Sequence, residues 1–408
     1  MTSHYGCDVA RREVLRLGLY AGGLAAALGV PMSLSGIARA AEAAASGRIL
    51  VVVELSGAND GLNTVVPYGD DAYYRARPRL GIRADKLRKI DDTFGFQSGM
   101  AGFERLYKDG WLAIVHGVGY DQPSFSHFSS MAYWHTGAPN SGAAYGWLGR
   151  LADGMDPAGT ADYLVNIDSH QSLAVRARSH VPLVFDDPDK FLRTAAFEEE
   201  SALRAVVTSR EVGNPTQRFL LEVANSAENA EPRLRQACAE YRTPVDYGLV
   251  HFGLDKVAAL IAAGFPTRIY YVAFRNNAFD THVQQSDVHA RLLTYTSDHI
   301  AAFLHDMDRI GRADDVCVMA FSEFGRRVAE NANLGTDHGT ASTLFIAGKR
   351  VRGGHYGKMP SLVDLDDGNM RYTTDFRRVY ATLIREWMNH SDVSAVLGRN
   401  FEPLGVFS

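Results

Sequence analysis

The sequence predicts an α/β fold in which helices cover both faces of a mostly parallel central sheet. Short apolar runs rich in Val and Ile have the length and composition of buried strands. Helix-forming stretches separate many of these runs, and such alternation is typical of a parallel sheet. Strands are expected at Ile49–Leu55, Leu112–Val118, Ile269–Phe274, Val316–Phe321 and Thr343–Ala347, and helices at Met100–Lys108, Ser286–Ile310 and Phe376–Asn389.

One internal segment does not follow this alternation. From Phe191 to Gly264 the chain is polar, helix-forming and rich in Glu, Arg and Ala. We therefore expect a helical insertion, or a cap on the sheet, over residues 191–264. The rest of residues 41–408 has the composition of an ordinary globular protein and the length of one large domain.

The N-terminal 40 residues have the pattern of an export signal. Arg11 and Arg12 precede an apolar run from Leu17 to Val30, and small residues around Ala40 form a cleavage box. The paired arginines indicate twin-arginine export, so the export machinery is an expected partner and the periplasm or another extracytoplasmic space the expected location. A retained anchor is the alternative, but the apolar run is shorter than the ~20 residues that a spanning helix needs. We expect no stable membrane span after cleavage.

Charge and cysteine content narrow the functional classes. The whole chain carries a net charge of −5, and removing the leader lowers it to −7, because the leader holds four Arg against one Asp and one Glu. This mild acidity, without a basic run, argues against a nucleic-acid partner. Cys238 and Cys317 remain after cleavage and are expected as two buried thiols, although the compartment also allows one disulfide.

Polar residues follow the predicted strands where each strand ends. Ligands of open α/β sheets bind beyond the carboxyl ends of the strands, so these tails are expected to converge on one site. The tails contain Asp60, Ser124, Ser126, His127, Asp280, His282, Glu323, Arg326, Asp337 and His338.

Three of these tails favour a metal site. Asp280 and His282 are two residues apart, so in an extended segment both side chains point the same way. Asp337 and His338 form a second carboxylate–imidazole pair, and Glu323 adds a carboxylate. Mixed oxygen and nitrogen ligands suit zinc, manganese or iron(II), with magnesium or calcium as alternatives. Separately, each segment also fits a turn, a solvated loop or a helix N-terminal charge.

The serine tail and the arginine suggest further roles. A hydroxyl of Ser124 or Ser126 near a metal could act as a nucleophile, with His127 as base or ligand. Either serine could instead cap a helix that begins near Phe128. Arg326 could bind an anionic substrate bidentately.

These residues resemble a known family. Gly57 to Asn63, Ser124 to Phe128, Phe279 to His282, Ser322 to Arg326 and Thr336 to Thr340 are similar in order and spacing to the Tat-exported bacterial family called domain of unknown function 1501. That family is similar to the alkaline phosphatase and sulfatase superfamily. The resemblance implies an α/β sandwich with a metal-centred site for phosphate or sulfate esters.

Carried over residue by residue, the resemblance implies a first metal held by Asp280, His282 and His338. Asp60 looks like the superfamily's early aspartate, although Asn59 could serve instead as a neutral oxygen ligand. Asp60 and Glu323 would then hold a second ion or orient the ligands of the first. Glu323 stands where the superfamily has an Asp–His pair for a second metal, but the next residue, Phe324, cannot ligate. The sulfatase signature is absent at the serine tail, so a formylglycine mechanism is not expected.

The function expected from the sequence is a metal-dependent periplasmic hydrolase of phosphate or sulfate esters with a serine nucleophile. Its substrate would be an anionic small molecule or glycan ester. The alternative is a non-catalytic, metal-stabilised binding or envelope-assembly protein on the same fold, because one fold hosts many functions.

Export by the twin-arginine route has a direct test. Replacing both Arg11 and Arg12 by Lys keeps the charge and removes the arginine pair that the pathway reads. We expect the precursor to accumulate in the cytoplasm, measured by fractionation and immunoblotting. Undiminished mature protein in the periplasm would rule out this route.

Overall fold

The computed structural model describes residues 47–190, 230–274 and 276–407. The chain divides into two compact units, Met1–Gly47 and Arg48–Ser408, and the fold that follows is that of the second. The predicted export signal lies outside the described residues, as does the part of the predicted insertion at residues 191–229. Within the rest of that insertion, residues 230–240 and α9 (Leu254–Ala262) are helical.

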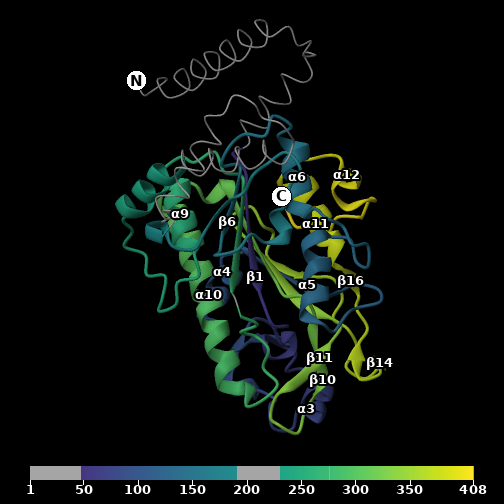
Figure 1. Ribbon diagram of the computed structural model, residues 1–408. Helices are drawn as coiled ribbons and strands as arrows, with labels where there is room; N and C mark the ends of the chain where they lie inside the picture. The colour runs from purple at the N-terminus through teal and green to yellow at the C-terminus, as the bar shows by residue number, and fades with distance from the viewer. Residues whose placement is uncertain (1–46, 191–229, 275, 408) are drawn as a thin grey trace, which may run out of the picture. The chain divides into compact units, whose positions relative to one another are not determined.

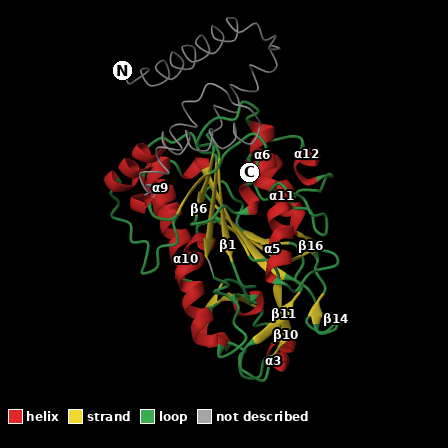
Figure 2. Ribbon diagram, viewed as in Figure 1, coloured by secondary structure: helices red, strands yellow, loops and turns green. Residues whose placement is uncertain are grey.

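The main sheet is mostly parallel, and the predicted fold class is therefore confirmed (Figures 1 and 2). Its strands lie in the order β13-β5-β12-β9-β1-β8-β6-β7, and β16 also pairs with β5. All the pairs are parallel except those of β12. The strands are β1 (Ile49–Leu55), β5 (Leu112–Gly119), β6 (Leu164–Ile167), β7 (Leu183–Phe185), β8 (Ile269–Phe274), β9 (Val316–Phe321), β12 (Ser342–Ala347), β13 (Gly354–Tyr356) and β16 (Thr374–Asp375).

Two apolar cores lie on opposite faces of this sheet. Every residue of β1 is buried, and its alternate side chains enter different cores, as the period of two along a strand requires. Figure 1 shows α10 on one side of the sheet and α5 and α11 on the other. The helices are α4 (Ala101–Lys108), α9 and α10 (Gln285–Arg309) on the first face, and α5 (His127–Thr136), α6 (Trp147–Met155), α11 (Phe376–Thr382) and α12 (Val393–Leu397) on the second.

The three expected helices are present, and the last is partly of another type. After α11 the chain continues as a π-helix, Leu383–Trp387. Trp387 at its end donates a hydrogen bond from Nε1 to the carbonyl of Ile49 at 3.0 Å, which fastens the helix to the start of β1.

Strand β12 is antiparallel to both of its neighbours, which the sequence did not reveal. Its first residue, Ser342, pairs with Val118 near the end of β5. The segment that precedes β12 therefore lies at the edge where the parallel strands end. This reversal brings His338 to the same edge as the tails of β1, β5, β8 and β9.

Beyond that edge, a smaller apolar cluster forms around Leu62, Tyr73 and Val328. It is surrounded by short elements: η1 (Gly61–Asn63), β2 (Val65–Val66), α3 (Asp71–Ala76), η2 (Ala84–Lys86), β3 (Arg88–Lys89), β4 (Gly95–Phe96), β10 (Gly325–Glu330), β11 (Thr336–Gly339), β14 (Leu365–Asp366) and β15 (Asn369–Met370). Three further short helices connect the main layers: η3 (Leu173–Val175), η4 (Pro188–Lys190) and η5 (Ala313–Asp315).

Two other expectations can be compared with the structure. Cys238 and Cys317 are both free thiols, Cys317 in the core on β9 and Cys238 partly buried. Among the described residues, no helix is both long and apolar enough to cross a membrane.

Candidate metal centre

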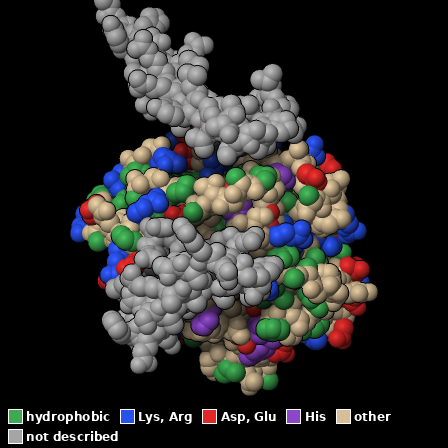
Figure 3. Space-filling view, turned by 45° about the horizontal axis from the view of Figure 1, so that its top comes forward, with side chains coloured by type: hydrophobic (Ala, Val, Ile, Leu, Met, Phe, Trp, Pro, Cys, Tyr) green, Lys and Arg blue, Asp and Glu red, His purple; other side chains and the backbone are tan. Residues whose placement is uncertain are grey.

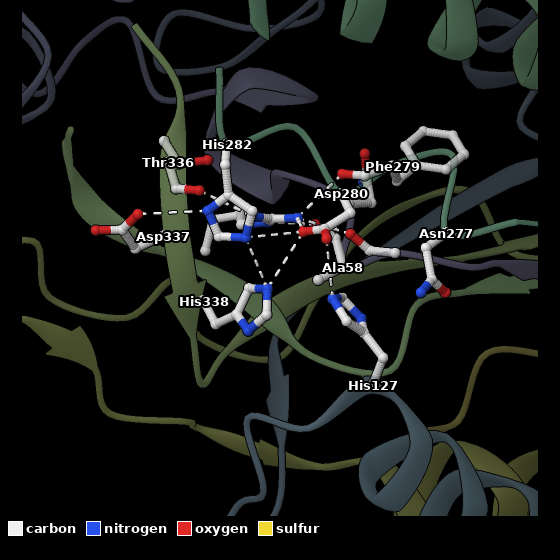
Figure 4. Close-up of polar contacts among 12 residues, drawn as sticks. Ala58, His127, Asn277, Phe279, Asp280, His282, Thr336, Asp337 and His338 are labelled. Atoms are coloured by element: carbon white, nitrogen blue, oxygen red, sulfur yellow. Dashed lines mark hydrogen bonds and ion pairs between the residues drawn. The ribbon is translucent and has the colours of Figure 1, made fainter. Parts of the chain in front are cut away.

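Three imidazoles converge on the carboxylate of Asp280 (Figure 4). Nε2 of His282 lies 2.9 Å from Asp280 Oδ1, and Nε2 of His338 lies 3.2 Å from the same oxygen. Nε2 of His127 lies 3.4 Å from Asp280 Oδ2. His282 and His338 also bring their Nε2 atoms within 2.9 Å of each other. We call these four residues the centre.

Each imidazole is held from behind by an acceptor on its other ring nitrogen. Nδ1 of His127 lies 2.7 Å from Glu323 Oε1, and Nδ1 of His338 lies 2.9 Å from the carbonyl of Phe125. Nδ1 of His282 lies 3.4 Å from Asp337 Oδ1. Carbonyl and carboxylate oxygens only accept, so a neutral imidazole that uses its outer contact carries the proton on Nδ1 and has the Nε2 lone pair free for a metal ion. Histidine ligands of metals are commonly oriented in this way. In the metal-free protein, His338 Nε2 can instead donate to Asp280 Oδ1.

The donor atoms fit a small divalent ion. One ligand atom from each of His127, Asp280 and His338 lies within 4.8 Å of the other two, close enough for a single ion to be shared by all three. His282 Nε2 adds a fourth donor, 2.9 Å from both Asp280 Oδ1 and His338 Nε2. His127 Nε2 is buried and has no hydrogen-bond partner among the described residues. A buried polar atom without a partner destabilises the fold, and coordination of a metal ion would remove that destabilisation. Nitrogen-rich ligation favours zinc over calcium or magnesium.

The centre is open to solvent on one side. The side chains of its four residues are between 18% and 36% exposed, so a small molecule can reach them. Figure 3 shows histidine side chains at the surface beside acidic and hydrophobic ones. A closed structural zinc site is fully surrounded by protein, whereas a catalytic one keeps an open position.

Helix α5 places the first imidazole. Ser126 is its N-cap, and its side-chain oxygen accepts a hydrogen bond from the backbone N–H of Ser129. His127 is therefore the first residue of the helix, directly after the loop that leaves β5. Its ring packs against Phe324, with the ring centroids 4.9 Å apart. Phe324 thus supports the centre without being able to ligate.

The loop after β8 places Asp280 and His282, and it depends on a glycine in the loop after β1. Gly57 has φ +112°, and a Cβ there would lie 2.6 Å from the backbone nitrogen of Asp280. Only glycine allows so close an approach in this conformation. The Asp280 carboxylate is consequently held against the first strand's tail.

The hairpin β10–β11 places His338 directly opposite Arg326. The Arg326 guanidinium is buried and donates to the carbonyls of Gly57 (2.7 Å), Ala58 (2.7 Å), Phe279 (3.1 Å) and Thr336 (2.8 Å). It also forms an ion pair with Asp280 Oδ1 at 2.8 Å. One side chain therefore joins the loops after β1 and β8 to β11.

These contacts set the charges of the metal-free centre. The hydrogen bond to Glu323 raises the pKa of His127, with burial acting in the opposite direction. Burial tends to raise the pKa of Asp280, but hydrogen bonds from Arg326 and His338 lower it below its ordinary value. Burial lowers the pKa of His338. A metal competes with protons for the same nitrogens, so its affinity falls as the imidazoles become protonated.

Glu323 lies behind the centre. Its carboxylate accepts hydrogen bonds from the backbone N–H groups of Gly57 and Ala58, and from the hydroxyl of Ser322, besides the bond to His127. Burial tends to raise its pKa, and these hydrogen bonds lower it. Two roles were expected for Glu323: to hold a second ion or to orient the ligands of the first. Its position behind His127 fits the orienting role. Asp337 likewise lies behind His282.

Asp60 is placed away from the ligand role expected for it. It is buried, and it forms an ion pair with Arg77 at 2.6 Å and accepts from Gln285 at 2.6 Å. It is also the N-cap of η1. Because both its oxygens have partners in this network, we do not include Asp60 in the centre.

The two serines make local hydrogen bonds. Ser126 caps α5, and the Ser124 hydroxyl accepts from the backbone N–H of Ser126 at 3.2 Å. Neither hydroxyl is hydrogen-bonded to the centre within the part of the chain that the structure describes. The capping role, one of the two that the sequence left open, accounts for Ser126.

Arg326 does not have the free donors that anion binding requires. Four backbone carbonyls and Asp280 already accept from it, and its side chain is fully buried. The β10–β11 hairpin was not predicted from the sequence. Its signal was the Asn- and Gly-containing turn from Asn331 to Gly335 between two short runs.

Arg326→Lys tests this assembly. Lysine keeps the charge but cannot supply the planar fork of donors, so buried carbonyls lose their partners. We expect the free energy of unfolding to fall by about 1–3 kcal/mol for each carbonyl that is left without a donor, measured by chemical denaturation. The matched control is Arg327→Lys. Arg327 is 39% exposed and lies 3.5 Å from the exposed Asp367, so this change should alter stability by less than about 0.5 kcal/mol. Equal losses of stability in the two variants would contradict this role of Arg326.

Comparison with known proteins found distant structural likenesses. The zinc complex of the periplasmic domain of EcEptC from Escherichia coli is 10% identical, with TM-score 0.35 and 73% of each chain covered. A protein in the alkaline phosphatase superfamily from Vibrio parahaemolyticus is 10% identical, with TM-score 0.34, covering 81% of this chain and 69% of that one. The PsFucS1 sulfatase from Pseudoalteromonas sp. is 12% identical, with TM-score 0.35, covering 88% and 73%.

Comparison with curated proteins gave no match. The family comparison is decisive, because one family model matches residues 48–388, which include all four residues of the centre and their outer partners. The chain therefore belongs to the family described as protein of unknown function (DUF1501).

Proposed function

We propose that this protein binds one divalent metal ion, zinc or manganese, at His127, Asp280, His282 and His338 and hydrolyses phosphate or sulfate esters there. The observation that carries the proposal is the orientation of the three imidazoles. All three present Nε2 to one carboxylate, and all three have an acceptor behind Nδ1. A neutral imidazole donates from only one nitrogen, so an acceptor on each side of the ring leaves one contact that a metal ion would satisfy.

A bound ion would act as a Lewis acid on an ester oxygen and lower the pKa of a nearby water. The chain's own contribution is to hold the ligands. Glu323, Asp337 and the Phe125 carbonyl fix the imidazole tautomers, and Arg326 fixes the carboxylate. Since Ser124 and Ser126 make local hydrogen bonds, the nucleophile that we propose is a water molecule.

A second candidate is a metal-stabilised binding protein without turnover. The observation that favours it is the engagement of Ser126 and Arg326, the groups expected to act as nucleophile and anion binder. Metal content alone does not separate the two functions, because both need the same four ligands. Turnover separates them.

The proposed place of action is outside the cytoplasm. This rests on the Arg11-Arg12 pair and the apolar run that follows it, which lie outside the described residues. Substrates would then be esters encountered in the periplasm or beyond, such as small molecules or glycans.

Removal of single ligands tests the metal. We expect His282→Ala and His338→Ala each to lower bound metal, measured by inductively coupled plasma mass spectrometry on protein purified through its export route. They should also lower the melting temperature, because bound metal stabilises the folded state by mass action. His170→Ala, an exposed histidine outside the centre, is the control. If both ligand variants keep wild-type metal content, the centre is misassigned.

The serine variants test the nucleophile and the function class together. Ser126→Ala should cost ~1 kcal/mol of stability as a lost helix cap. With zinc or manganese supplied, we expect wild type, Ser124→Ala and Ser126→Ala to hydrolyse p-nitrophenyl phosphate or sulfate at rates within a few-fold of one another. Loss of turnover in either variant, with metal retained, would restore the serine mechanism. No turnover by metal-loaded wild type would favour the binding function.

A further inference from the structure

The opening of the centre carries exposed apolar side chains. Phe125 is 41% exposed, Phe128 88% and Val283 59%. These are three of the seven large apolar side chains that are exposed among the described residues, and each lies within two residues of a ligand. Positions so close to a ligand are a small part of the chain, so the exposed apolar residues are concentrated near the ligands in the sequence. We call these three residues the rim.

The rim is physically joined to the centre. The Phe125 carbonyl accepts from His338 Nδ1 at 2.9 Å, and the Phe125 ring lies edge-on to Phe324, 6.4 Å between centroids. Phe324 packs against His338 at 4.8 Å. Phe128 and Val283 directly follow the ligands His127 and His282 in the chain. Phe125 is thus in contact with the surroundings of the ligands, and Phe128 and Val283 are exposed one residue away from a ligand.

The cation beside the centre cannot bind an anionic group, so apolar contacts would have to contribute to substrate binding. Arg326, the cation that contacts the centre, directs its guanidinium to four carbonyls and Asp280. It therefore offers no free fork of donors to an anionic group. Binding of an ester must then draw on the metal and on contacts with the rest of the molecule. Apolar area removed from water at the rim supplies such contacts.

We propose that the ester bound at this centre carries an apolar aryl or alkyl group, which packs against Phe125, Phe128 and Val283. This inference rests on the proposed function and names its substrate class. Three side chains around a metal centre suit one small apolar group. A stable contact between two proteins needs about 800 Å² from each partner, far more than three side chains provide.

The experiment compares two phosphonates, whose P–C bond resists hydrolysis. Isothermal titration of zinc-loaded protein is expected to show phenylphosphonate binding about tenfold more tightly than methylphosphonate, from partial burial of one ring. The Phe128→Ala/Val283→Ala double variant should lose this preference and keep its affinity for methylphosphonate and its zinc content. Phe128→Ala alone should lose part of the preference. Leu249→Ala is its matched control, since Leu249 is 90% exposed and should leave the preference unchanged.

The outcomes separate this inference from the proposed function. Zinc-loaded protein that binds both phosphonates equally, or neither, overturns the inference and leaves the metal site standing. A preference that survives the double variant also overturns it. If the double variant instead changes the oligomeric mass or the binding to phospholipid vesicles, the rim serves another protein or a membrane, and the inference is wrong. Failure of wild type to retain zinc overturns the proposed function and this inference with it.

Discussion

The centre depends on one buried guanidinium. Arg326 receives no solvent, and its donors connect the carbonyls of Gly57, Ala58, Phe279 and Thr336 with the carboxylate of Asp280. These acceptors belong to segments that are far apart in the chain, and two of the segments carry residues of the centre. A buried cation is costly unless its donors are satisfied. The loops therefore cannot separate without leaving a charge unpaired, and this constraint keeps the ligands together even without an ion.

The topology of the sheet is the second feature on which the centre depends. Parallel strands end at one edge, which brings the tails of β1, β5, β8 and β9 together. Strand β12 runs in the opposite direction, so the residues before it reach the same edge and His338 joins the other ligands. Close approach at Gly57 then allows the first and eighth strands' tails to touch. The ligands are thus placed by topology, and Arg326 and the outer acceptors adjust them.

The sequence predicted those parts of the protein that depend on local composition. Five buried strands were recognisable because Val and Ile runs of that length are rarely anything else, and Asp280, His282 and His338 stood out by their spacing. The direction of β12 was not predictable, because it depends on pairing with strands that are distant in sequence. Arg326 and Arg327 look alike in the chain, and only long-range contacts bury one of them. The role of Ser126, as a helix cap or a nucleophile, likewise depends on contacts that the sequence does not show. The same holds for Asp60, which could be a metal ligand or the ion-pair partner of Arg77.

The most direct test of the account is X-ray absorption spectroscopy of the metal in protein purified through its export route. We expect one zinc or manganese ion per chain, held by His127, Asp280 and His338 with His282 as the fourth ligand, at about 2.0–2.2 Å for zinc. His338→Ala should remove one imidazole from the signal. Protein that carries no metal, or an ion with oxygen or sulfur ligands alone, would contradict the central claim.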